Sequence, residues 1–158
     1  MALIELETWI EAPIERVFDL ARSVDAHMAS TEGTGEKAIA GRTSGLIGAG
    51  EWVRWRARHF GVTQCLTVRI TAFDRPNAFE DEMTRGAFSE MRHRHRFVEQ
   101  DGGTLMRDEF YFTAPLGVLG RMAERWFLVR YMTGFLKRRG RALKALAESD
   151  GWEKYVRD

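Results

Sequence analysis

Apolar and polar side chains alternate strictly along residues 91–97 and again along residues 104–112. A period of two residues is typical of a β-strand with one face in water and the other in a core. Residues 100–103, Gln-Asp-Gly-Gly, separate the two arms and have the composition of a tight turn. The two arms are therefore predicted to form a β-hairpin. Its core-facing positions are Met91, His93, His95 and Phe97 in the first arm and Thr104, Met106, Asp108, Phe110 and Phe112 in the second.

The register of this hairpin places a histidine beside a carboxylate. Whether the loop has two or four residues, His95 pairs with Asp108 and His93 pairs with Phe110. Directly opposed residues have Cβ atoms roughly 5 Å apart, so His95 and Asp108 can form a charge-assisted hydrogen bond. This polar pair on an otherwise apolar face is the centre of the functional hypothesis.

The N-terminal half of the chain is predicted to hold a strand, two short helices and several further strands. Leu3–Ala12 alternates as a half-buried strand, and Pro13 ends it and suits the first turn of a helix. Apolar residues at helical spacing follow, and Ser23–Asp25 indicates the break before a short second helix through Met28. Residues 33–50 hold six glycines and are predicted to be irregular and flexible. The further strand candidates are Glu36–Ala40, Glu51–Phe60, Thr63–Phe73 and Ala78–Thr84.

After Pro115 the spacing of apolar residues changes to that of a long amphipathic helix. Phe127 and Tyr131 fall outside the apolar stripe, so they are expected either to form an exposed patch for a homodimer or to pack against the N-terminal helices. The stripe comprises Leu119, Met122, Trp126, Val129, Thr133, Leu136 and Leu143.

A basic cluster lies near the end of this helix, formed by Lys137, Arg138, Arg139, Arg141 and Lys144. Solvation and the negative end of the helix dipole account for such a cluster, and anionic head groups or nucleic acid are the alternatives. A nucleic-acid surface would carry an exposed aromatic platform between the basic residues, and this stretch lacks one. No nucleic-acid partner is expected.

Composition indicates a soluble protein with one core. The chain has 158 residues, 44% of them hydrophobic, and 24 basic against 23 acidic residues, so its net charge does not favour a polyanionic partner. No apolar run is long enough to span a bilayer, and the N-terminus lacks the pattern of a signal peptide, so a single domain over residues 1–158 in the cytoplasm is expected, without stable membrane insertion. The lone cysteine, Cys65, excludes an internal disulfide.

Five segments carry a family resemblance, namely Ile10–Phe18, Trp52–Gly61, Arg92–Phe97, Gly102–Asp108 and Ala114–Gly117. With the order of predicted elements, they resemble the helix-grip fold of the START and polyketide cyclase (SRPBCC) superfamily, in particular its bacterial cyclase/dehydrase-like branch. The resemblance covers almost the whole chain and implies an α+β fold with a curved antiparallel sheet of about six to seven strands around a long C-terminal helix. It also implies a cavity for hydrophobic small molecules between sheet and helix, without fixing an activity.

Within such a cavity, His95 oriented by Asp108 is the candidate acid or base, and Asp81 or His93 is the candidate second participant. A two-residue turn at Arg85–Gly86 would point Asp81 away from the histidines, whereas a three-residue turn with a bulge would bring them together. The alternative without chemistry is that His95 and Asp108 satisfy each other in the core and fix the strand register. The residues expected to contact ligand are Trp55, Asp81, His93, His95, Asp108, Phe110 and Trp126.

Two further features bear on cofactors. His93, His95 and Asp108 form a possible two-histidine, one-carboxylate metal triad, but alternate strand residues spread apart and the superfamily's iron-binding members place their histidines at a helical spacing absent here. The loop 45–50, Gly-Leu-Ile-Gly-Ala-Gly, lacks the lysine and hydroxyl residue of a phosphate-binding loop and is predicted to be a lid or a tight connection. No metal and no other cofactor is expected.

The function predicted from the sequence is binding of a hydrophobic or amphipathic, lipid- or polyketide-like small molecule. The first alternative is an enzyme of cyclase, dehydratase or hydrolase type that uses His95 and Asp108. The second is a non-catalytic interaction domain that works through its C-terminal helix, which predicts a small or filled cavity.

Overall fold

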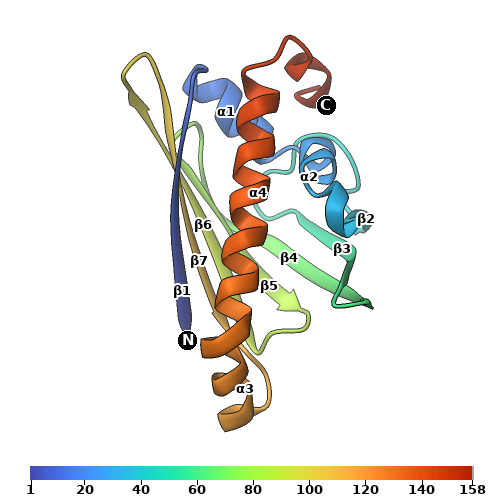
Figure 1. Ribbon diagram of the computed structural model, residues 1–158. Helices are drawn as coiled ribbons and strands as arrows, with labels where there is room; N and C mark the ends of the chain where they lie inside the picture. Colours follow the sequence, from blue (N-terminus) through green and yellow to red (C-terminus); the bar gives the residue numbers. More distant parts are fainter. Residues whose placement is uncertain (158) are drawn as a thin grey trace.

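The computed structural model describes residues 1–157 and has one curved antiparallel sheet of seven strands (Figure 1). The spatial order is β1-β7-β6-β5-β4-β3-β2, so the first and last strands of the sequence are neighbours where β1 pairs with β7. The strands predicted outside the hairpin each begin and end within two residues of the observed ones. The strands are β1 (Ala2–Ile10), β2 (Lys37–Gly41), β3 (Trp52–His59), β4 (Val62–Asp74), β5 (Ala78–Arg85), β6 (Glu90–Gln100) and β7 (Gly103–Thr113).

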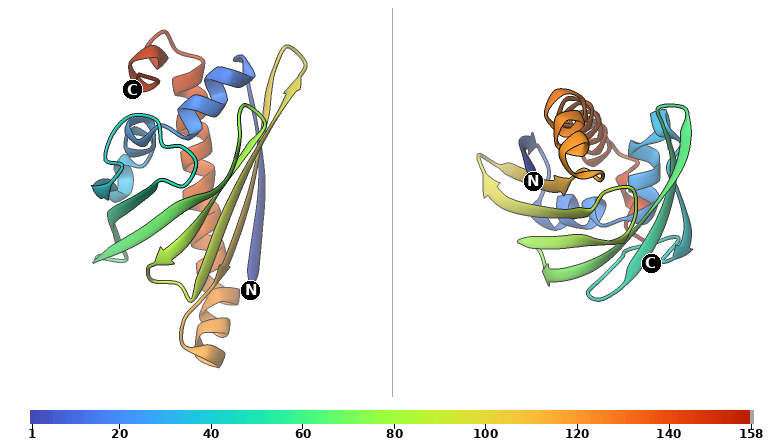
Figure 2. Two further views of the ribbon diagram at one scale, coloured as in Figure 1. Left: turned by 180° about the vertical axis from the view of Figure 1, so that it is seen from behind. Right: turned by 90° about the horizontal axis from the view of Figure 1, so that it is seen from below.

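The helices lie on the concave face of the sheet, which curls around them (Figure 2). Two short helices, α1 (Ile14–Ala21) and α2 (Val24–Ser30), follow the first strand, and the long helix α4 (Val129–Ala147) runs along the face (Figure 1). The predicted α+β helix-grip class is thereby confirmed. The remaining helical segments are α3 (Gly117–Ala123), a π-helical turn (Glu124–Leu128) and two short 3-10 turns (Glu32–Thr34 and Trp152–Tyr155).

The hairpin of β6 and β7 has the predicted register. His95 is opposite Asp108, His93 is opposite Phe110, and the two strands are joined by the two-residue turn Asp101-Gly102. Both turn residues have positive φ, 52° and 77°, which is the conformation that matches the twist of a tight hairpin. The alternation along the two arms therefore determined both the pairing and the face on which the histidines lie.

Phe18 anchors α1 in the core at one end of the sheet. Its ring is fully buried and meets the rings of Phe73, Phe79 and Phe97 edge to face, with centroids 5.3 to 5.4 Å apart. Pro13, in an extended conformation, is the N-cap residue of α1, one position before the first turn in which the sequence predicted it. This aromatic cluster fixes α1 against β4, β5 and β6.

Helix α4 packs closely against β1. Gly140 is buried, and a Cβ atom at this position would lie 3.0 Å from Oγ1 of Thr8, so a larger residue would push the helix away from the strand. Leu136 and Leu143 flank this contact and are 6% and 4% exposed. The C-terminal half of the predicted stripe therefore forms the core as expected.

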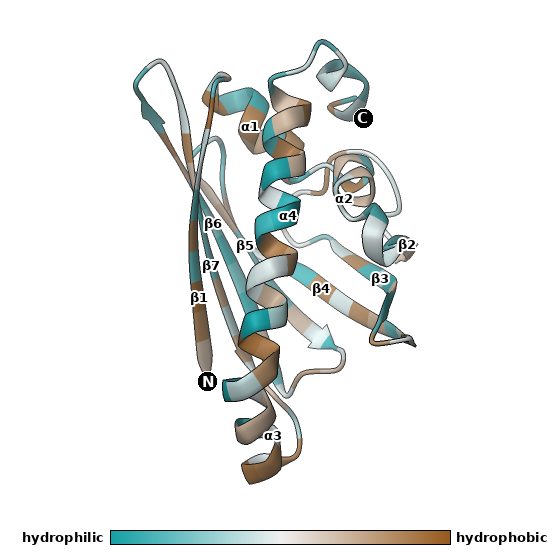
Figure 3. Ribbon diagram, viewed as in Figure 1, coloured by the Kyte–Doolittle hydropathy of each residue, from teal (hydrophilic) through white to brown (hydrophobic). Residues whose placement is uncertain are grey.

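The N-terminal half of that stripe is not buried, so this part of the prediction is wrong. The expected continuous helix is interrupted by the π-helical turn, and α3 extends beyond the end of the sheet (Figure 1), where Figure 3 shows apolar residues. Leu119, Met122 and Trp126 are 72%, 57% and 77% exposed. Helical spacing marks an apolar face, but this segment has no sheet opposite to bury it.

Within residues 1–157, no helix has the length and apolar character needed to cross a membrane.

Candidate functional site

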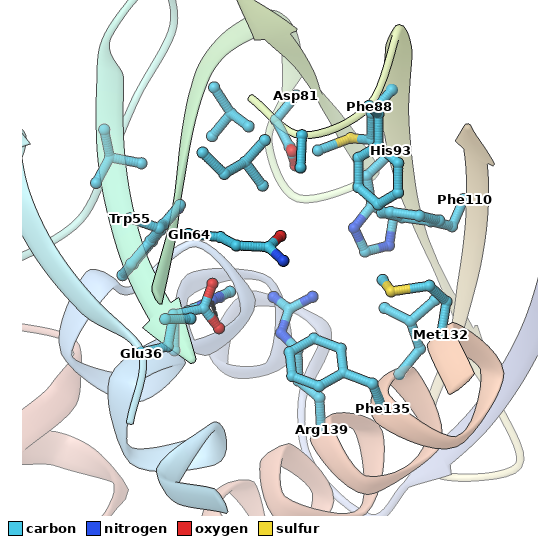
Figure 4. Close-up of a pocket in the computed structure, with 18 of the residues that line it drawn as sticks. Glu36, Trp55, Gln64, Asp81, Phe88, His93, Phe110, Met132, Phe135 and Arg139 are labelled. Atoms are coloured by element: carbon cyan, nitrogen blue, oxygen red, sulfur yellow. Dashed lines mark ion pairs between the residues drawn. The ribbon is translucent and has the colours of Figure 1, made fainter. Parts of the chain in front are cut away.

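A cavity of about 390 Å³ lies between the concave face of the sheet and α4 (Figure 4). Its volume falls in the range of small-molecule sites, about 300–1,000 Å³. Most of its wall is apolar, and two groups of polar side chains lie on different parts of it, besides single polar residues such as Gln64 and Arg139. The apolar wall includes Val53, Trp55, Val68, Phe110, Met132 and Phe135.

The hairpin of β6 and β7 supplies the first polar group. Nδ1 of His95 lies 2.8 Å from Oδ1 of Asp108, and Nε2 of His93 lies 3.0 Å from the same oxygen. A carboxylate only accepts hydrogen bonds, so both of these ring nitrogens carry a hydrogen and donate it. Asp108 thereby orients both imidazole rings, whose centroids are 3.8 Å apart.

Strand β5 adds Asp81 to this group. Asp81 is directly opposite His93 in the register of β5 and β6, and its Oδ2 lies 3.3 Å from Nε2 of His95. The connection between the strands is neither of the two short turns that the sequence left open, because residues 86–89 separate them. The longer connection keeps Asp81 on the cavity face with the histidines.

Burial and the neighbouring charges set the pKa values of the group. Burial, reinforced by the charge of His95, lowers the pKa of His93 to about 4, so His93 is neutral at pH 7. Burial also opposes the charged form of His95, but hydrogen bonds to Asp108 and Asp81 outweigh it and raise the pKa of His95. For Asp108, burial favours the neutral form, yet the two histidines outweigh it and hold the pKa well below its usual range.

A second polar group surrounds Glu36, across the cavity from Asp81 and His93 in Figure 4. Oε2 of Glu36 lies 3.2 Å from Nε2 of His27, whose ring stacks on Trp55 with centroids 4.1 Å apart. Burial raises the pKa of Glu36, but the charge of the neighbouring His27 outweighs it and lowers the pKa. The sequence did not predict this pair, because its members come from α2 and an irregular glycine-rich stretch whose approach no periodicity reveals.

Arg139 also projects into the cavity from α4 (Figure 4). The sequence grouped it with a solvated basic cluster, yet it lies three residues after Leu136 and four before Leu143, on the face that packs against the sheet. That spacing was a usable signal, because a charged residue on a buried stripe either pairs or lines a cavity. Burial raises the pKa of Asp81, but the hydrogen bond from His95 and the charges of both histidines outweigh it and lower the pKa. The charge of Arg139 adds a smaller effect in the same direction.

The structure brings most of the predicted contact residues together. Asp108 lies behind the histidines and borders a separate small void of about 10 Å³ instead of the main cavity. Trp126 is a correction, because it is 77% exposed in the π-helical turn and does not line the cavity. The predicted residues that do line it are Trp55, Asp81, His93, His95 and Phe110.

The glycine-rich loop 45–50 has the properties of a tight connection and not of a lid. Leu46 and Ile47 are 8% and 6% exposed. The backbone N–H of Val24 donates to the carbonyl of Gly45, and that of Ile47 donates to the carbonyl of Arg22. The loop is therefore packed against the junction between α1 and α2.

The two aromatic residues predicted beside the stripe contact the turn between β3 and β4. The ring of Phe60 lies 5.1 Å from that of Phe127 and 4.4 Å from that of Tyr131. Oη of Tyr131 lies 2.6 Å from Nδ1 of His59. Phe127 is 54% exposed, and homodimerisation through this face stays a prediction.

The cavity group also contains the residues best placed to hold a metal ion. One donor atom from each of Asp81, His93 and His95 lies within 4.8 Å of the donors of the other two. The triad predicted from the sequence contained Asp108 in place of Asp81. Although alternate strand residues were expected to spread apart, the ring centroids of His93 and His95 are 3.8 Å apart.

A curved sheet around a long helix, with an apolar cavity and a few converging polar groups, defines the class of helix-grip, START-like proteins. The chain belongs to the family described as "Polyketide cyclase / dehydrase and lipid transport", which matches residues 1–148. Among curated protein sequences, none matches this chain.

Solved structures with the same fold come from bacteria and plants. A protein of Thermus thermophilus superposes with a TM-score of 0.71 at 19% identity, covering 94% of this chain and 100% of that one. A START superfamily protein of Mycobacterium smegmatis gives 0.70 at 14% identity, covering 92% and 97%. The ginseng major latex-like protein 151 of Panax ginseng gives 0.67 at 15% identity, covering 94% and 98%. At these identities the likeness extends to the fold alone.

Proposed function

We propose that this chain acts as one ligand-binding domain that holds an amphipathic small molecule in the cavity between the sheet and α4. The observation that carries the proposal is a largely apolar cavity of about 390 Å³ whose wall carries buried His93 and His95 and half-buried Asp81. The fold of the family supports binding of a hydrophobic ligand. The polar residues of the site indicate that one end of this ligand is polar.

The apolar body of the ligand would contribute most of the affinity. Trp55 and Phe110 are 6% and 5% exposed and offer flat apolar surface on two sides of the cavity. Burial of apolar ligand surface contributes roughly 25 cal/mol per Å², reduced by the entropy lost on binding. The proposed ligand is therefore a lipid- or polyketide-like molecule with a largely apolar surface.

The polar group would determine the orientation of the ligand. Neutral His93 offers one nitrogen beyond the one that Asp108 engages, and Asp81 accepts hydrogen bonds at the cavity surface. A hydroxyl or carbonyl group placed here gains a directional hydrogen bond and satisfies a polar atom that would otherwise face an apolar cavity. We therefore expect the ligand's hydroxyl or carbonyl end to lie against β5 and β6.

An enzyme of cyclase, dehydratase or hydrolase type is the second candidate. The observation in its favour is that His95, oriented by Asp108, reaches Asp81 at the cavity wall, an arrangement that can deliver a proton to a bound carbonyl. Replacement of His95 by Gln would then abolish turnover while the ligand still binds. The third reading, an interaction domain with a filled cavity, is disfavoured by the observed volume.

Native mass spectrometry of freshly purified protein, beside the same sample after denaturation and solvent extraction, tests the proposal directly. Extra mass retained in the folded protein and released on unfolding would support ligand binding and identify the ligand. If the folded protein carries no extra mass and takes up none from a panel of fatty acids, sterols and aromatic polyketides, the proposal fails.

Filling the cavity should abolish uptake of the same ligand. Ala57 lines the cavity and is 7% exposed, so Ala57→Phe places a benzyl group where the ligand's apolar body would lie. Ala72, on the exposed side of β4, provides the matched control Ala72→Phe. We expect Ala57→Phe to weaken binding at least tenfold, about 1.4 kcal/mol, and Ala72→Phe to leave the dissociation constant unchanged. Equal affinity in both variants would place the ligand elsewhere.

A further inference from the structure

We propose that Asp81, His93 and His95 form a binding site for a divalent transition-metal ion of the zinc and ferrous-iron class. The three donors come from two neighbouring strands, with the histidines at alternate positions of β6 and the aspartate opposite His93 on β5. Their donor atoms already lie within 4.8 Å of one another, and Oδ2 of Asp81 is 3.3 Å from Nε2 of His95.

These distances are close to what an ion requires. Zinc binds nitrogen and carboxylate oxygen at about 2.0–2.2 Å, which separates tetrahedral donors by roughly 3.4 Å. The pair of Asp81 and His95 has this separation, and a donor atom of His93 lies within 4.8 Å of both.

Asp108 supplies the outer support that metal-binding histidines need. It accepts a hydrogen bond from Nδ1 of His95 and from Nε2 of His93, which leaves Nε2 of His95 and Nδ1 of His93 to face an ion. Nε2 of His95 lies 3.3 Å from Oδ2 of Asp81, so an ion bound between them would displace the proton that holds these two groups together. A carboxylate bound to the far nitrogen fixes the tautomer and orientation of a metal-binding imidazole. Here one buried carboxylate does this for both rings at once.

The donor set and its surroundings select the kind of ion. Two imidazoles and one carboxylate suit zinc or ferrous iron, whereas magnesium and calcium prefer oxygen donors alone. Asp81, His93 and His95 all border the main cavity, so the remaining coordination positions face the space where a ligand would lie. Asp108 borders the separate void and stays behind the rings.

The surrounding charges also match a cation. Asp81 and Asp108 bring two carboxylates into a wall lined by Phe79 and Phe110, and the side chain of Asp108 is 11% exposed. Buried carboxylates are stabilised when they coordinate or lie next to a cation. Arg139 is the one basic side chain that approaches the cavity from α4 within residues 1–157, and its positive charge opposes a cation, so the two carboxylates must outweigh it.

Metal titrations of the purified, chelator-treated protein test this inference without any organic ligand. Isothermal titration with Zn²⁺ should give one site per chain, and Co²⁺ should give a visible absorption band of nitrogen and oxygen ligation. We expect Asp81→Asn and His93→Asn each to weaken Zn²⁺ binding at least tenfold. Loss of a residue that only supports a metal ligand already weakens metal binding about 10- to 100-fold, and these two residues are ligands themselves. Glu82→Gln, which changes the neighbouring carboxylate on the opposite face of β5, is the matched control and should bind Zn²⁺ as the wild type does.

Circular dichroism of each variant separates loss of the site from loss of the fold, and Asp81→Asn is the variant least damaging to packing. Absence of saturable Zn²⁺ and Co²⁺ binding in the wild type would overturn the inference. So would equal affinity in the wild type, Asp81→Asn and His93→Asn, because the ion would then be bound elsewhere. Either result would leave the proposed organic ligand untouched, since that ligand is measured separately by native mass spectrometry.

Discussion

At the scale of single residues, Asp108 is the side chain on which the polar group depends. One of its oxygens accepts hydrogen bonds from both His93 and His95, and all three residues are at most 8% exposed. Loss of this carboxylate would leave two imidazole N–H groups without their acceptor in an apolar wall. The arrangement is therefore a structural requirement whether or not the cavity also binds a ligand or an ion.

Asp108→Asn should lower the free energy of unfolding by about 3 kcal/mol, because a neutral amide is a weaker acceptor for both imidazoles and leaves the charge of His95 less compensated. Urea unfolding at pH 7 measures the difference. Asp101→Asn, in the exposed hairpin turn at φ 52°, is the matched control and should stay within about 0.5 kcal/mol of the wild type, since asparagine also tolerates this conformation. Comparable losses in both variants would contradict this account.

At the scale of elements, the C-terminal helical region shows that apolar spacing and burial are different things. Leu119 and Leu136 belong to one predicted stripe, yet they are 72% and 6% exposed. The π-helical turn, Glu124–Leu128, lies between them and shifts the stripe around the helix axis. Beyond that turn α3 lies past the end of the sheet (Figure 1), so its apolar side chains meet no opposing surface.

Truncation of these two leucines should have very different costs. Leu136→Ala removes a side chain from the core and should lower the free energy of unfolding by about 2–5 kcal/mol. Leu119→Ala removes a side chain already in water and should change it by less than about 0.5 kcal/mol. Chemical denaturation of both variants gives the comparison. A large loss for Leu119→Ala would mean that α3 is buried in solution, for example against a second copy of the chain.

At the scale of the whole molecule, an ion-pair network ties the N-terminal helices to the far turn of the sheet. Asp19 of α1 lies 2.8 Å from Nε of Arg22 and 2.7 Å from Nη2 of Arg75, in the turn between β4 and β5. Burial raises the pKa of Asp19, but the hydrogen bonds and charges of the two arginines outweigh it and lower the pKa below its ordinary value of 3.8. A carboxyl group with a depressed pKa stabilises the fold above its unfolded pKa and loses that effect as the pH falls through its folded pKa.

Asp19→Asn should therefore destabilise the protein by about 1 kcal/mol at pH 7, the upper range for a partly exposed ion pair. The difference between wild type and variant should shrink below about pH 4 as the wild-type carboxylate becomes protonated. Urea unfolding at pH 7 and pH 3 tests both statements, with the exposed Asp150→Asn as a control expected to change little at either pH. A difference that grew toward acid pH would show that the sign of the shift is wrong.

Local patterns in the sequence were enough to predict the strands and the hairpin register, and the resemblance to the START and polyketide cyclase superfamily added the helix-grip class. Alternation with a period of two assigns each side chain to a face, and a two-residue turn leaves one possible pairing, so His95 beside Asp108 followed from local pattern alone. The same pattern predicted Trp55 and Phe110 in the cavity wall. These results depend on contacts within a strand or between neighbouring strands.

Tertiary structure alone decided the rest of the site. Asp81 joins the histidines because residues 86–89 form a longer connection than either turn considered, and Glu36 meets His27 because an irregular stretch folds over α2. Trp126 lies outside the predicted site because a π-helical turn and the end of the sheet both intervene. Periodicity reports which face of an element is apolar, whereas the position of one element against another depends on loop geometry and packing, which have no period in the sequence.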